Sequence, residues 1–343
     1  MYITRPNTFV IPVLYVEKQT LGIETFNTRQ DISIGVSFPS TTIPRWLRDK
    51  EAMEKEAISK GIKLKMQIGD DTPELQIKQI KDLISQGINV LIIIPVNSAS
   101  LASAVELAKK AGIKVIAYAR IIFNSDLDLY IGNDNIQTGE LQGRFLIKKV
   151  PKGNYIIISG DPNDFNARTF KEGAMKFILP LVYLNNIKII SEESLINWSP
   201  QKAYNIVKNI LLANNKIDAI LAPNDAAAGA AIKALEEQGL DGKVVVTGQG
   251  ADLDGIRRII QGTQSMTVFK DTRELAKTAI ASAIKLIKGE PIDINSTINN
   301  EKKNVPAIIE PVTLVTKENI EDTIIKSGYW KKEDIYRNIR QNK

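Results

Sequence analysis

The sequence predicts an α/β protein made of two doubly wound parallel-sheet lobes joined by a hinge. First, apolar runs of strand length alternate with amphipathic stretches of helix length from Asp31 onward, as in parallel sheets covered by helices on both faces. Second, this succession occurs twice, over residues 31–134 and again over residues 135–269. Third, a length of 343 residues favours two domains over one.

Ten apolar runs are predicted to be strands, five in each series. They are residues 31–38, 62–69, 90–95, 113–119, 128–132, 154–159, 187–191, 219–223, 244–250 and 265–270. Helical spacing of apolar residues predicts helices between most of them. These are residues 45–61, 74–87, 100–112, 200–215 and 272–288. Several helices end at a glycine, which readily adopts the left-handed conformation of a helix stop.

The predicted lobes exchange segments late in the chain. Residues 31–134 plus 270–298 form the N-terminal lobe, and residues 135–269 plus 299–330 form the C-terminal lobe. Residues 1–30, which contain an apolar run at 9–16, are interpreted as a leader or anchor remnant or a disordered segment. Residues 331–343 form a basic tail, expected to be a frayed end. No run is long and apolar enough to span a bilayer.

The composition excludes several kinds of chemistry. The chain has no His and no Cys, so triad or thiol catalysis and imidazole or thiolate metal sites are not possible. We expect no metal and no cofactor, and an enzyme is disfavoured although carboxylate catalysis remains open. The net charge of +6 is scattered over Lys-rich helix faces, so we expect no nucleic acid as a partner.

Polar residues follow the predicted strands at many of their carboxyl ends. Ligands of open α/β sheets bind at these ends, and a mixture of donors and acceptors suits a small hydroxylated molecule. Each residue also has a structural explanation. Asp164, Asp225 and Asp252 precede helices and could cap them, and Asp225 is the expected cap of the Ala-rich helix after Pro223. The joint occurrence of such residues in both series favours a binding site.

Several ordered stretches resemble one known family. They include DLISQGINVLIIIP at 82–95, KKAGIKVIAYAR at 109–120, NDAAAGAAIKAL at 224–235, GKVVVTGQGADLDGI at 242–256 and NIEDTIIKSGYW at 319–330. The chain from about residue 31 to about residue 328 resembles the periplasmic sugar-binding proteins of the ribose-binding type, and among them the xylose-binding branch. The resemblance implies two lobes, joined by three hinge strands, that close on a pyranose.

Carried over residue by residue, the resemblance implies eight contacts with the sugar. They are Arg45, Trp46, Arg120, Asp164, Asn166, Trp198, Asn224 and Lys270. The two tryptophans would sandwich the ring, the cations would donate to hydroxyls and Asp164 would accept. The chain departs from the xylose-binding pattern twice, because Ala119 and Gly250 stand where that pattern has aspartates. D-xylose is the favoured ligand, and these departures leave other monosaccharides open.

The resemblance also implies an extracytoplasmic location and a membrane protein as partner. That partner is either a sensor histidine kinase, which the departures and the N-terminal segment slightly favour, or the permease of an ABC importer. Two other classes are less favoured. A repressor would need a helix-turn-helix pattern before Asp31, which the sequence lacks, and a glycosidase would need Asp164 and Asp225 as paired carboxylates.

Overall fold

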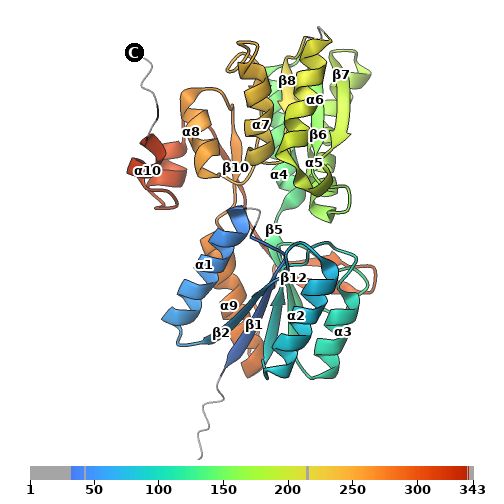
Figure 1. The fold of residues 1–343 in the computed structure, drawn as a ribbon, viewed down its shortest axis with the longest axis vertical. Helices are drawn as coiled ribbons and strands as arrows, with labels where there is room; N and C mark the ends of the chain where they lie inside the picture. The colour runs from blue at the N-terminus through green and yellow to red at the C-terminus, as the bar shows by residue number, and fades with distance from the viewer. Residues whose placement is uncertain (1–31, 42–43, 214–215, 338, 340–343) are drawn as a thin grey trace, which may run out of the picture. The chain divides into compact units, whose positions relative to one another are not determined.

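The computed structural model describes residues 32–41, 44–213, 216–337 and 339. Within these residues the chain forms two parallel sheets with helices on their faces (Figure 1), which confirms the predicted fold class. The predicted leader, residues 1–30, lies outside the described part. None of the described helices is long and apolar enough to cross a membrane.

The first sheet has seven strands in the order β11-β12-β5-β4-β3-β1-β2. Its strands are β1 (Ser33–Phe38), β2 (Lys63–Ile68), β3 (Val90–Ile93), β4 (Lys114–Tyr118), β5 (Leu129–Asn133), β11 (Ser296–Asn299) and β12 (Asn304–Glu310). All of its pairings are parallel except that of β11 with β12. Every residue of β1, β3 and β5 is buried, as expected for central strands covered on both faces.

Two pairs of helices cover this sheet, one pair on each face. Helices α1 (Pro44–Ser59) and α9 (Thr272–Lys288) pack against each other and share an apolar cluster with Ile92 of β3. Helices α2 (Pro73–Ser85) and α3 (Ala102–Lys110) share another cluster with Leu91 and Ile93. Alternate residues of one strand therefore face opposite helix pairs, and α1 and α9 lie on the same side of the sheet (Figure 1).

The second sheet has four parallel strands in the order β7-β6-β8-β9. Its strands are β6 (Gly153–Ser159), β7 (Ile187–Ser194), β8 (Ala219–Leu221) and β9 (Val245–Val246). The helices of this half are α4 (Asn135–Lys149), α5 (Phe165–Tyr183), α6 (Pro200–Leu212), α7 (Asp225–Glu236) and α8 (Leu253–Gln261). Tyr155 and Ile157 pack with α4 and α5, whereas Ile156 and Ile158 pack with α6 and α7.

Glycines bring α4 and α5 into close contact. A Cβ atom at Gly139 would lie 1.9 Å from the carbonyl oxygen of Phe170, and one at Gly143 would lie 2.4 Å from that of Ala174. Any larger residue would therefore push the two helices apart. This close approach fixes the position of α5, whose first turns carry three residues of the pocket described below.

The chain passes three times between the two sheets: after β5, before α9 and after β12. Strands β10 (Thr267–Phe269) and β13 (Thr313–Val315) pair antiparallel beside two of these passages. Residues 299–330 were expected in the C-terminal lobe, but β12 pairs with β5 in the first sheet. Val305 and Ala307 of β12 are buried in that sheet. Only the residues after Glu310 pair with β10, through β13.

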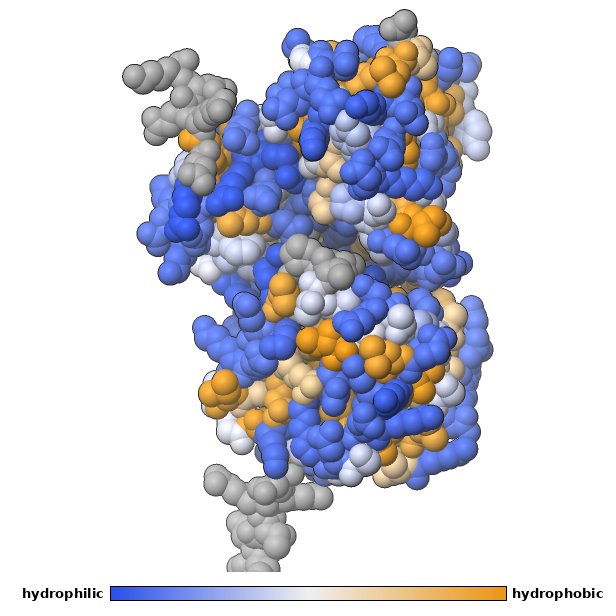
Figure 2. Space-filling view, in the orientation of Figure 1, coloured by the Kyte–Doolittle hydropathy of each residue, from blue (hydrophilic) through white to orange (hydrophobic). Residues whose placement is uncertain are grey.

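The basic tail is not frayed where the structure describes it. A π-helical turn, η2 (Glu321–Ile325), is followed by the short helix α10 (Lys332–Tyr336). Ile335 of α10 is buried against α8, and Arg257 donates hydrogen bonds to the carbonyls of Asp334 and Ile335. This docking was not predictable from the sequence, because a single buried isoleucine among charged residues has no periodicity. Elsewhere hydrophobic residues form only small groups on the visible face (Figure 2).

Candidate functional site

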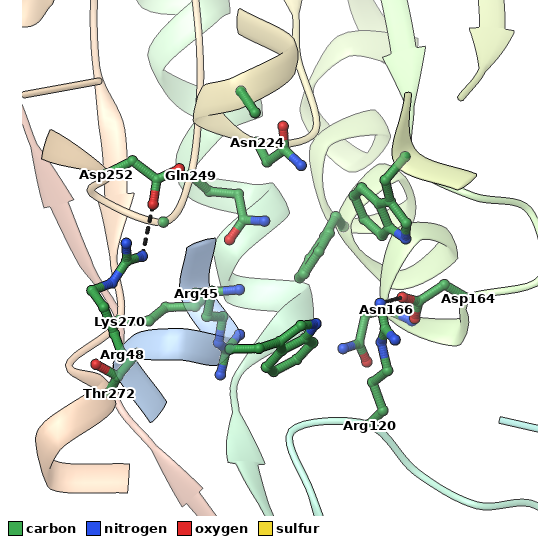
Figure 3. Close-up of a pocket in the computed structure, with 15 residues that line it drawn as sticks. Arg45, Arg48, Arg120, Asp164, Asn166, Asn224, Gln249, Asp252, Lys270 and Thr272 are labelled. Carbon is green, nitrogen blue, oxygen red and sulfur yellow. Dashed lines mark hydrogen bonds and ion pairs between the residues drawn. The ribbon is translucent and has the colours of Figure 1, made fainter. Parts of the chain in front are cut away.

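One pocket brings together all eight of the residues that sequence reasoning selected. Its walls come from α1, α9 and the turn after β4 on the side of the first sheet, and from the strand ends of the second sheet (Figure 3). The lining residues are Arg45, Trp46, Arg48, Arg120, Asp164, Asn166, Phe170, Trp198, Asn224, Ala226, Gln249, Gly250, Asp252, Lys270 and Thr272. Parallel pairing places the strand carboxyl ends of each sheet at one edge, and the pocket takes residues from both sheets and from α1.

A buried ion pair crosses the pocket between Arg120 and Asp164. A terminal nitrogen of Arg120 lies 2.9 Å from Oδ2 of Asp164, and the guanidinium also donates to the carbonyls of Pro95 and Val96. The other oxygen of Asp164 accepts the N–H of Asn166 and caps α5, as expected for this residue. Because both charges are nearly fully buried, each depends on the other for its stability.

Asn166 ties the same corner of the pocket together. Its Nδ2 donates to the carbonyl oxygen of Ala119 at 2.9 Å, and its Oδ1 accepts from Nδ2 of Asn135 at 2.8 Å. Ala119 itself has φ 61°, in the left-handed region that costs an alanine roughly 1–2 kcal/mol. The turn at Ala119 directs Arg120 toward Asp164, so the backbone strain here serves the geometry of the ion pair.

Two guanidinium groups lie close to the ring of Trp46. The Cζ atoms of Arg45 and Arg120 lie 5.1 and 5.2 Å from the centre of its ring, within cation–π range. The residue is 4% exposed, and no acceptor among the described residues receives its indole N–H. Nη2 of Arg45 is likewise buried without an acceptor there. Two donors in this wall are thus available to a bound molecule.

Trp198 is held in the pocket wall by an unusual backbone. It ends the short helix η1 (Ile196–Trp198), and both Asn197 and Trp198 have φ 54°. The N–H of Asn197 donates to Oδ2 of Asp161, which holds this turn. A Cβ atom at Gly160 would lie 2.2 Å from the indole, so the ring packs directly on a residue that must lack a side chain. The aromatic surface is therefore rigidly placed.

Lys270 is a buried cation that makes no ion pair with the described residues, although Asp164 and Asp134 lie near enough to act on its charge. Its ammonium lies 4.3 Å from the ring centre of Phe170, and no described residue accepts a hydrogen bond from it. Burial, with Arg45 nearby, lowers the pKa of the Lys270 ammonium well below its ordinary value. A buried donor left without an acceptor costs stability, so its presence points to a molecule that supplies one.

The roles of Asn224 and Asp225 differ from those expected. Asn224 caps α7, because its Oδ1 accepts the N–H of Ala227 at 2.8 Å, while the residue still lines the pocket. The expectation that Asp225 caps the helix is wrong. Asp225 is the first residue of α7, is fully buried, and accepts from Asp252 N–H, Gln264 Nε2 and Thr267 Oγ1. It acts as a brace behind the pocket because its side chain turns inward.

Asp252 was also expected to cap a helix, and this too is wrong. It occupies the N-cap position of α8 without a capping hydrogen bond, and its Oδ1 instead accepts from Arg48 at 2.7 Å. Sequence reasoning did not select Arg48, Phe170, Gln249 or Thr272 as contacts, whereas Asp252 had a second interpretation as a carboxylate that could shift to compensate for the missing aspartates. A signal existed for Arg48, which follows Arg45 at helical spacing and therefore shares its face of α1.

The two positions that lack the expected aspartates differ in their setting. The carbonyl of Ala119 holds Asn166, and its N–H donates to Ile131. Gly250 lines the pocket with φ 117°, a conformation that residues with a side chain rarely adopt. In the described residues no group of three or more acidic side chains could hold a metal ion. The pocket thus presents hydrogen-bond donors, two indoles and two carboxylates, each paired with an arginine, to a small polar ligand.

Comparisons with known proteins give a consistent result. A family model described as a periplasmic binding protein domain matches residues 34–291. The D-xylose-binding periplasmic protein of Haemophilus influenzae is 43% identical over 308 residues, which cover 90% of this chain and 93% of that protein.

Solved structures are similar over nearly the same length. A carbohydrate transporter solute binding protein from Chloroflexus aurantiacus, in complex with D-glucose, has a TM-score of 0.84 and 32% identity, covering 89% of this chain and 98% of that one. An ABC transporter solute binding protein from Clostridium phytofermentans with bound β-D-glucose has a TM-score of 0.82 and 31% identity, covering 88% and 99%.

The buried brace predicts a pH-dependent stability. Burial, reinforced by the charge of Asp252, raises the pKa of Asp225 to about 6. The folded state therefore binds the carboxyl proton of Asp225 more tightly than the unfolded state does. The stability that this proton contributes is lost as the pH rises from about 4 to about 6. Relative to the Asp225→Asn variant, the unsubstituted chain should lose about 3 kcal/mol of unfolding free energy over this range.

Urea unfolding at a series of pH values measures this difference. Asp254→Asn is the control, because it removes a carboxylate on the neighbouring helix α8 whose side chain is 75% exposed. An identical pH dependence in the unsubstituted chain and in Asp225→Asn would show that Asp225 does not titrate in this range.

Proposed function

Because the chain belongs to the family of periplasmic binding proteins, we propose that it is an extracytoplasmic receptor that closes on a monosaccharide, with D-xylose the favoured ligand. The observation that carries this proposal is that one pocket is lined by all eight residues that the family resemblance implies as sugar contacts. The chain is a binding protein and not an enzyme, in keeping with its sugar-binding relatives.

The chemistry of the pocket suits a pyranose. The indoles of Trp46 and Trp198 offer apolar surface to the C–H faces of a sugar ring. The ammonium of Lys270 and Nη2 of Arg45 need acceptors, which sugar hydroxyl oxygens supply. Asp164 would accept from hydroxyls, and the free amide of Asn224 would donate. These roles support binding through hydrogen bonds with the ring packed between aromatic residues.

Closure on the ligand is the mechanism we propose. The chain passes three times between the sheets, and these passages would act as the hinge. A ligand that contacts α1 and Arg120 on one side and the ends of β6 and β8 on the other favours the closed arrangement by its differential affinity. A membrane partner would recognise the surface that closure forms.

The partner that we favour is the permease of an ABC importer. The sequence slightly favoured a sensor kinase, but the solved relatives carry the names of transporter solute binding proteins. No comparison supports the kinase. Delivery to an importer is therefore the better supported role. Sensing is the alternative, and deletion of the gene distinguishes the two.

Substitution of Trp198 should weaken sugar binding selectively. Removing the indole leaves part of the bound sugar exposed to water, which should cost about 2–3 kcal/mol of binding free energy. Trp198→Ala should therefore bind D-xylose roughly 30- to 150-fold more weakly in calorimetric titration. Tyr183→Ala, at a tyrosine 79% exposed and away from the pocket, should bind as the unsubstituted chain does. Heat with another sugar and none with D-xylose would contradict the ligand and leave the family unaffected.

Substitution of Lys270 should move affinity and stability in opposite directions. Lys270→Met removes a desolvated ammonium that has no acceptor, which should raise the unfolding free energy of the sugar-free protein by about 1–3 kcal/mol. The same change removes a charged donor to the sugar and should weaken binding by about 10- to 100-fold. Thermal unfolding and calorimetry test both parts. Unchanged affinity in a stabilised variant would show that Lys270 does not contact the ligand.

Deletion of the gene should separate the two kinds of partner. An importer subunit predicts that uptake of dilute D-xylose is lost while the induction of xylose-responsive genes persists in cells supplied with ample sugar. Measurement of labelled xylose uptake and of transcript levels in the same strains provides the test. Loss of induction with uptake capacity intact in cells that express the transporter constitutively would favour the sensor instead.

A further inference from the structure

Asp252 presents a carboxylate to the pocket at a place where helix capping would normally retain it. Asp is among the favoured N-cap residues because its side chain satisfies the free N–H groups of the first turn. At the start of α8 this bond is not made, and the carboxylate turns to Arg48 instead. Figure 3 shows the two side chains meeting at the pocket wall. The first turn of α8 therefore lacks a capping hydrogen bond, and the Asp252 carboxylate lies at the pocket wall.

The backbone that carries this carboxylate is fixed on both sides. The N–H of Asp252 donates to the buried Oδ2 of Asp225 at 2.9 Å. The N–H of Ala251 donates to Oγ1 of Thr267, and its carbonyl accepts the indole N–H of Trp330 at 2.8 Å. With the main chain held by three hydrogen bonds, the direction of the Asp252 side chain is determined by the fold.

Space in front of the carboxylate is kept open by the neighbouring glycine. A Cβ atom at Gly250 would lie 3.6 Å from Oδ1 of Asp252, the oxygen that Arg48 holds, so a larger side chain at this position would crowd the Asp252 carboxylate. The φ of 117° at Gly250 also disfavours any residue that has a side chain. An atom of a ligand can therefore approach Asp252 where a side chain would otherwise lie.

Arg48 orients the carboxylate and leaves part of it free. The guanidinium binds Oδ1 and lies over the ring of Trp330 at 5.6 Å. Among the described residues no N–H or O–H donates to Oδ2 of Asp252, whose side chain is 24% exposed. Nε of Arg48 is buried and has no acceptor there. Among the described residues, Oδ2 of Asp252 thus has no donor and Nε of Arg48 has no acceptor.

We propose that Asp252 is a ligand-binding carboxylate, which accepts a hydrogen bond from one hydroxyl of the sugar through Oδ2. Arg48 is the positioning residue that directs it. This inference rests on the proposed sugar-binding function and adds a residue that determines which hydroxyl pattern the pocket accepts. An ion pair that served stability alone would not need an open acceptor facing the pocket.

Calorimetric titration with D-xylose and with its monodeoxy analogues tests the proposal. Asp252→Asn should weaken D-xylose binding by about 10- to 100-fold, because a hydrogen bond to a charged acceptor is lost. For the one analogue that lacks the bound hydroxyl, the variant and the unsubstituted chain should bind equally well. Arg48→Met should show the same dependence on the analogue with a smaller loss, and Arg48→Lys should recover part of it.

Asp254→Asn is the matched control, because it removes an exposed carboxylate from the same helix. It should bind every sugar as the unsubstituted chain does, and thermal unfolding verifies that each variant is folded. Equal weakening by Asp252→Asn across D-xylose and all analogues would show a structural role and overturn the proposal, as would unchanged binding of D-xylose. Absence of binding by the unsubstituted chain to D-xylose and D-glucose would instead overturn the sugar-binding function itself.

Discussion

Parallel pairing of the strands is the constraint on which the site depends. In a parallel sheet every carboxyl end lies at the same edge, so residues far apart in sequence meet without any dedicated segment to join them. Asp164 after β6 and Asn224 after β8 meet in this way in the second sheet, and Arg120 reaches the same pocket from the end of β4 in the first sheet. The buried pair of Arg120 and Asp164 then links the two sides of that pocket.

The charges around the pocket are arranged so that only some are neutralised by the protein. Each of the two lining carboxylates is held by an arginine, Asp164 by Arg120 and Asp252 by Arg48. Lys270 has only the ring of Phe170. A site that keeps desolvated donors unpaired loses folding stability and gains binding energy when acceptors arrive. Affinity for a polyhydroxylated ligand and stability of the empty protein are therefore opposed here.

A second layer behind the pocket keeps the lining residues in place. Asp225 accepts hydrogen bonds from three groups and holds the backbone at Asp252, while Gly160 lets Trp198 pack flat against β6. Gly139 and Gly143 let α4 support α5 from the other side. Small residues and a buried carboxylate fix the positions of the lining side chains, because a closely packed interior allows little displacement.

The sequence by itself determined the fold class and the strand order along the chain, and its resemblance to a known family implied the eight residues that line the pocket. Periodicity reports which residues are buried, and strand ends report where ligands bind, so both are local signals. Only the tertiary structure decided that β12 completes the first sheet, that Asn224 and not Asp225 caps α7, and that Asp252 turns to Arg48. These depend on partners 177 residues away for β12 (Ala307 with Tyr130) and 204 residues away for Asp252. Sequence spacing does not show that a distant partner will replace the local capping hydrogen bond.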